Sequence, residues 1–205
     1  MDSERAGKEL AIIRQLMERP VRYSTTSGLS GVLAGAAALA GLALDWRISC
    51  RRDLDPHAAM WLCMAVWGGV FAVAFAGVTI LTRLRERRRN MPFWSPVKRR
   101  ILRTIGPPFV AGVGLTGAIV YRWYAGQEPN QWGLIPSIWM VCHGLACWQV
   151  GEFSIRELRA MGAAFILTGL VAAAWWQFDP YWTVGLSFGG YHLLYGAVVW
   201  RRYGG

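Results

Sequence analysis

Long stretches without charge alternate with short charged ones along the whole chain. Six windows free of Asp, Glu, Lys and Arg recur, each 18 to 25 residues long. A helix needs about 17–25 predominantly apolar residues to cross the hydrocarbon core of a bilayer. Backbone N–H and C=O groups must be paired internally there, so windows of this length form helices. The pattern predicts six membrane-spanning helices, over residues 25–44, 58–82, 104–122, 132–150, 160–178 and 181–200.

The composition supports the same fold class. Of the 205 residues, 54% are hydrophobic and only 17% are charged, whereas about a quarter of a typical soluble domain is charged. A soluble globular domain is therefore excluded, and a membrane barrel would need alternation over segments of about ten residues. We predict an all-α polytopic membrane protein with one six-helix domain over residues 23–205.

The segment before the first span has its own pattern. Leu10, Ile13 and Met17 recur at helical spacing, which predicts a short amphipathic helix within residues 1–22 that ends before Pro20. Such a helix lies in the membrane interface with its apolar stripe toward the lipid. The alternative is a docking helix for a cytoplasmic protein partner.

The positive charges divide unequally between the two sides of the predicted bundle. Eighteen of the 22 Lys and Arg residues fall on the side that holds both termini, and four fall on the other. Loops rich in Lys and Arg stay in the cytoplasm. We therefore predict that both termini are cytoplasmic and that residues 45–57 and 122–131 lie outside.

The most basic connection is residues 83–103, which hold nine Lys or Arg residues and one acid, Glu86. Lys and Arg beside a span attract the anionic lipids of the cytoplasmic leaflet, and an acidic protein partner is the alternative. Nucleic acid is not predicted, because no recognised binding module accompanies the charge.

The candidate surface for lipid or partner contact combines this connection with the polar residues after the fourth span. The predicted set is Arg83, Arg85, Arg87, Arg88, Arg89, Lys98, Arg99, Arg100, Glu152, Arg156 and Glu157. Glu152 and Arg156 are four residues apart, a spacing that favours an ion pair at a helix start.

Two histidines, His143 and His192, are the candidate ligands for a metal or haem inside the predicted spans. A metal site normally needs three or four ligands, so we assign no metal, cofactor or catalytic residue. We favour a structural role in which His192 points into the bundle and bonds a polar group on another span. The candidate partners are Ser137, Thr116, Thr168 and His143.

Glycines recur at spacings that allow helices to approach closely. The sets that predict close packing are Gly31 with Gly35, Gly185 with Gly189, and the cluster Gly112, Gly114 and Gly117.

Several stretches carry a resemblance to a known group of proteins. They are Ile-Arg-Gln-Leu-Met-Glu-Arg (13–19), Ser-Gly-Leu-Ser-Gly-Val-Leu-Ala-Gly (27–35), Gly-Glu-Phe-Ser-Ile-Arg-Glu-Leu-Arg (151–159), Phe-Gly-Gly-Tyr-His-Leu-Leu-Tyr-Gly (188–196) and Arg-Arg-Tyr-Gly-Gly (201–205). The chain resembles a group of small, uncharacterised bacterial membrane proteins with six spans. The resemblance implies a bacterial inner-membrane location and supplies no catalytic motif.

The function predicted from these observations is non-enzymatic: a membrane protein whose basic cytoplasmic face binds a partner or senses the bilayer. Two alternatives stay open at this point. One is a small carrier or channel, and the other is a redox protein with a metal or haem bound by histidine.

Overall fold

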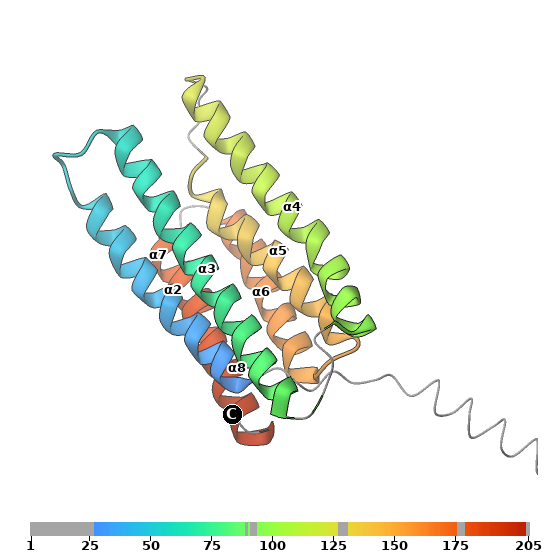
Figure 1. Ribbon diagram of the computed structural model, residues 1–205. Coiled ribbons are helices and arrows are strands. Elements are labelled where there is room, and N and C mark those ends of the chain that lie inside the picture. The colour runs from blue at the N-terminus through green and yellow to red at the C-terminus, as the bar shows by residue number, and fades with distance from the viewer. Residues whose placement is uncertain (1–26, 89, 91–93, 127–130, 176–178, 204–205) are drawn as a thin grey trace, which may run out of the picture.

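A computed structural model describes residues 27–88, 90, 94–126, 131–175 and 179–203, and every regular element within those ranges is a helix (Figure 1). The elements are α2 (Gly28–Ser49), α3 (Pro56–Arg88), α4 (Pro96–Tyr124), α5 (Leu134–Gly151), α6 (Arg156–Ala174), α7 (Pro180–Val184), the π-helix η1 (Gly185–Tyr191) and α8 (His192–Tyr203). The all-α prediction is confirmed for these residues. The amphipathic helix predicted within residues 1–22 lies outside them.

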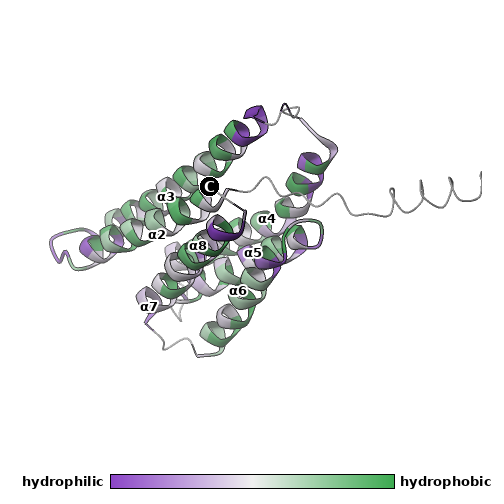
Figure 2. Cartoon of the chain, turned by 90° about the horizontal axis from the view of Figure 1, so that it is seen from below, coloured by the Kyte–Doolittle hydropathy of each residue, from purple (hydrophilic) through white to green (hydrophobic). Residues whose placement is uncertain are grey.

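Five of these helices, α2 to α6, are long and apolar enough to cross a membrane. They coincide with five of the six predicted spans. The sixth predicted segment, 181–200, is helical along its whole length, but η1 divides it into two shorter α-helices. Figure 2 shows the hydrophobic residues along the helix flanks and the hydrophilic residues gathered at the helix ends. These are the length and surface of a polytopic membrane protein.

Three helices begin in the same way, with a capping side chain followed by proline. The pairs are Asp55–Pro56 at α3, Ser95–Pro96 at α4 and Asp179–Pro180 at α7. Each capping oxygen accepts a hydrogen bond from a backbone N–H of the first turn, at 3.0, 3.3 and 2.8 Å respectively. Proline fits the first turn because its missing N–H would have no partner there. Local chemistry therefore fixes these three helix starts.

The basic connection is far more helical than its charge suggested. The α3 helix continues to Arg88 and α4 begins at Pro96, eight residues before the predicted start at residue 104. Arginine and lysine are good helix formers, so a helix does not stop where its apolar window stops. The helices α3 and α4 therefore extend beyond the predicted spans 58–82 and 104–122.

The helices pack as two groups. In one group α2 packs against α3 and α8, and in the other α5 packs against α4 and α6. Contacts of α6 with α8 and η1 join the groups (Figure 1). The buried core lies at this junction and contains Met140, Cys147, Ile155, Met161, Phe165, Tyr195 and Val199.

Glycines seven residues apart hold the helices of each group together. The pairs are Gly28 and Gly35 on α2, Gly189 and Gly196 on η1 and α8, Gly144 and Gly151 on α5, and Gly162 and Gly169 on α6. A Cβ atom on Gly196 would lie 2.5 Å from the backbone nitrogen of Val32, and one on Gly162 would lie 2.5 Å from that of Trp148. Backbones this close leave no room for a side chain. In lipid such packing takes the place of the hydrophobic effect between helices.

The predicted glycine cluster on α4 behaves differently. A Cβ atom on Gly112 would lie 3.4 Å from the ring of Trp139, but one on Gly114 or Gly117 would meet nothing within 4 Å. The prediction of close helix packing is therefore wrong for Gly114 and Gly117. These two residues face away from the neighbouring helix α5.

Candidate functional site

One end of the bundle is strongly basic. It is the end at which α3, α5 and α8 finish and α4 and α6 begin, and we call it the basic end. Two open cavities lie there, on either side of the short turn between α5 and α6. Glu152, the first residue of that turn, lines both.

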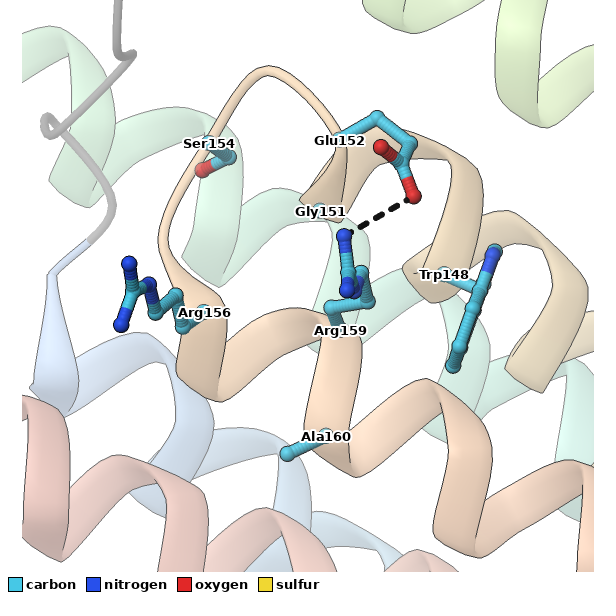
Figure 3. A pocket seen from close by; sticks show the side chains of 7 residues that line it. All are labelled: Trp148, Gly151, Glu152, Ser154, Arg156, Arg159 and Ala160. Atoms are coloured by element: carbon cyan, nitrogen blue, oxygen red, sulfur yellow. Dashed lines mark hydrogen bonds and ion pairs between the residues drawn. The ribbon is translucent and has the colours of Figure 1, made fainter.

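The first cavity has a volume of about 610 Å³ and lies between the end of α5 and the start of α6 (Figure 3). It is lined by Trp148, Gly151, Glu152, Ser154, Arg156, Arg159 and Ala160. In Figure 3, Arg159 extends from α6 across to Glu152 and Trp148, and Arg156 lies beside the turn that carries Ser154.

The second cavity has a volume of about 410 Å³ and lies between α4 and the same turn. It is lined by Arg100, Arg103, Thr104, Pro107, Gln149, Glu152 and Phe153. The two cavities together therefore present four arginines and one carboxylate, and each cavity holds two of the arginines.

The side chains of the turn between the cavities are buried and anchor it to the bundle. Phe153, Ser154 and Ile155 are only 7%, 6% and 7% exposed. This tight turn, with α6 beginning only at Arg156, places Glu152 opposite Arg159. The Arg159 Nη1 atom lies 3.2 Å from Glu152 Oε1. The predicted Glu152–Arg156 pair is therefore wrong, because these two residues do not share a helix.

One arginine in each cavity is stacked on an aromatic ring. The guanidinium carbon of Arg159 lies 5.2 Å from the ring centroid of Trp148, and that of Arg100 lies 4.5 Å from the ring centroid of Phe153. Stacking restrains a guanidinium while leaving its N–H donors available to a planar or tetrahedral oxyanion. All four arginines are exposed, and each cavity has one that is stacked on a ring beside a second arginine.

Charged residues of the predicted basic connection form a separate ion-pair cluster that joins α3 to α4. Glu86 is only 1% exposed. Its Oε2 atom accepts a hydrogen bond of 2.6 Å from Lys98 Nζ, and Arg83 Nη1 lies 3.9 Å away. These three residues therefore join two helices and do not form an open binding surface.

Glu157 forms a second set of interhelical hydrogen bonds, which joins α6 to the end of α8. Its carboxylate accepts hydrogen bonds from Arg202 Nη1 at 2.6 Å and from the Tyr203 hydroxyl at 3.3 Å. Arg85 of α3 donates to the Tyr203 carbonyl oxygen at 2.6 Å. The end of α8 thus connects α3 with α6.

The rest of the predicted set lies apart from the cavities. Arg87 and Arg88 are exposed on the last turn of α3, Arg99 lies 6.0 Å from the ring of Trp94, and Arg89 falls outside the described residues. The prediction did not include Arg103, Arg159, Trp148 or Phe153. The three-residue spacing of Arg156 and Arg159 on one helix was the available signal for Arg159.

The two interior histidines do meet. The ring centroids of His143 and His192 are 5.0 Å apart, and both rings pack against Phe165. His192 therefore points into the bundle, as predicted. Its Nδ1 atom, however, lies 3.0 Å from the carbonyl oxygen of Phe188 in its own segment. The predicted bond to another span is wrong, since a carbonyl one turn back on the same helix is within reach of the ring.

The surroundings of the histidine pair limit the redox alternative. His143 Nε2 lies 3.3 Å from Cys147 Sγ, and the two rings touch, so a porphyrin plane does not fit between them. Within the described ranges, no group of three or more His, Cys, Asp or Glu residues is placed to hold a metal ion.

Comparison of the chain with protein-family models, characterised proteins and solved structures finds no match. The resemblance to bacterial six-span membrane proteins therefore stays a prediction.

Proposed function

We propose that this protein is a six-span bacterial inner-membrane protein whose basic end faces the cytoplasm and binds anionic phospholipid. The observation that carries the proposal is the pair of arginine-lined cavities beside Glu152. Basic pockets between membrane helices on the cytoplasmic side bind lipid headgroups. Trp148 at the rim matches the headgroup level, where tryptophan is enriched.

The charge balance of the cavities supports a lipid phosphate as the ligand. Only one of the four arginines, Arg159, is ion-paired with a carboxylate that lines the cavities. A phosphate accepts paired hydrogen bonds from a guanidinium. An acidic segment of a cytoplasmic protein is the competing ligand, and the lipid test below separates the two.

The orientation of the chain makes the first prediction. A reporter that is active only in the cytoplasm is expected to be active when fused after the last residue, because eighteen of the 22 Lys and Arg residues lie on that side. A reporter that is active only in the periplasm is expected to work when inserted at Asp53, between α2 and α3. The opposite pattern would contradict the proposed topology.

Lipid preference makes the second prediction. Purified, delipidated protein is expected to unfold at a temperature several degrees higher with phosphatidylglycerol than with phosphatidylcholine, because each Lys or Arg near an anionic surface contributes about 1 kcal/mol. Added salt at 0.5 M is expected to reduce the difference, through screening of exposed charges. Equal stabilisation by both lipids would contradict specific binding of anionic lipid and favour a protein ligand.

A further inference from the structure

The two cavities have the same arrangement of arginines, and a lipid with a single phosphate would occupy only one of them. Each holds one arginine stacked on an aromatic ring, Arg159 on Trp148 and Arg100 on Phe153. Each also holds an exposed arginine, Arg156 in the first cavity and Arg103 in the second. Neither of these two forms an ion pair with another residue that the structure describes.

We infer that the two cavities form one seat for a phospholipid with two phosphate groups, of the cardiolipin class, with one phosphate in each cavity. The inference rests on the proposed function and specifies its ligand. Glu152 lines both cavities, so the two phosphate positions are neighbours on either side of a single side chain.

The charges of the seat match such a lipid. Four arginines and Glu152 give the lining a formal charge of +3. One phosphate diester would leave two positive charges uncompensated, whereas two would leave one. The ion pair of Glu152 with Arg159 keeps the carboxylate turned toward its own arginine, which reduces its repulsion of a phosphate.

The walls of the seat suit the rest of the lipid. Trp148 and Pro107 are exposed apolar side chains beside the arginines, and the glycerol and upper acyl carbons can lie on them.

Native mass spectrometry of the purified full chain tests the inference, with cardiolipin, phosphatidylglycerol, phosphatidylcholine and inorganic pyrophosphate as the four probes. Cardiolipin is expected to bind about tenfold more tightly than phosphatidylglycerol, because it engages a second pair of arginines. The double variant Arg103→Gln/Arg156→Gln, one change in each cavity, is expected to remove most of that preference. Arg87→Gln/Arg201→Gln removes the same charge from exposed positions at the same end and is expected to keep it.

The outcomes separate the seat from the broader function. If wild type binds cardiolipin and phosphatidylglycerol equally well, or both double variants lose the preference alike, the two-phosphate seat is wrong while anionic lipid binding stands. If neither cardiolipin nor phosphatidylglycerol binds better than phosphatidylcholine, the proposed function itself fails. If pyrophosphate displaces cardiolipin and binds as tightly, the ligand is a soluble diphosphate and the lipid assignment is wrong. An unchanged unfolding temperature without lipid confirms that both variants are folded.

Discussion

Replacing Gly162 with valine is expected to destabilise the protein by about 3 kcal/mol or more. A Cβ atom at this position would lie 2.5 Å from the Trp148 backbone nitrogen and 2.7 Å from the Gly144 carbonyl oxygen. Both neighbours are backbone atoms of α5, so α5 and α6 would have to move apart. The free energy of unfolding, measured by SDS titration followed by circular dichroism, checks the prediction.

Gly117 provides the matched control, because it also lies inside a long helix but its Cβ would meet nothing within 4 Å. Gly117→Val is expected to change the free energy of unfolding by less than about 1 kcal/mol, since only helix propensity changes. Similar losses for the two variants would show that α5 and α6 are not in backbone contact at Gly162.

Removing the Glu86 carboxylate is expected to cost about 3–5 kcal/mol of unfolding free energy, the usual effect of breaking a buried ion pair. The Glu86 side chain is 2% exposed and its partner Lys98 is 17% exposed. In Glu86→Ala, Lys98 and Arg83 would keep their charges in a poorly hydrated site without the carboxylate. The same SDS titration measures the loss.

The exposed ion pair of Arg51 with Asp53 is the control for the effect of burial on the Glu86–Lys98 pair. Its N–O distance is also 2.6 Å, but its side chains are 60% and 65% exposed. Asp53→Ala is therefore expected to cost less than about 1 kcal/mol. The double variant Glu86→Ala/Lys98→Ala is expected to recover part of the stability lost in Glu86→Ala. If Glu86→Ala loses no more unfolding free energy than Asp53→Ala, the prediction that a buried ion pair joins α3 and α4 is wrong.

The apolar spans could be predicted because one physical requirement, backbone pairing in hydrocarbon, leaves helices as the solution for long uncharged windows. The helix ends could not be taken from charge. Ser95 followed by Pro96 was a local signal for the start of α4, and the basic character of residues 83–103 obscured it. Hydropathy marks where lipid ends, whereas capping marks where a helix begins.

The candidate site depended on contacts that sequence spacing does not determine. Glu152 pairs with Arg159, seven positions along the chain, because a turn of buried residues separates α5 from α6. Glu86 was recognised as the single acid of a basic segment, but only packing shows that it is buried. The stacking of Arg100 on Phe153 joins α4 to the turn after α5, which no local pattern indicates.

The tryptophans also show which features the sequence predicts and which only the packing of the helices reveals. Nine of the 12 tryptophans lie near the ends of the charge-free windows, as membrane interfaces favour. Two that lie inside the windows, Trp67 and Trp139, donate hydrogen bonds between helices, to Asp45 Oδ2 at 2.6 Å and to Thr116 Oγ1 at 3.0 Å. The general preference was predictable, and the two specific bonds were not.

The π-helix η1 sets the angular phase of everything that follows it. A π-helix holds more residues per turn than an α-helix, so η1 takes up more residues than an α-helix would need for the same rotation. If Gly185–Tyr191 became α-helical at its present length, the downstream chain would rotate by about 100°. Gly196, which touches α2, and Arg202, which pairs with Glu157, both lie downstream. Single substitutions on the outer face of η1, such as at Leu186, which is 60% exposed, leave these directions unchanged, whereas a conversion of η1 to α-helix would break both contacts at once.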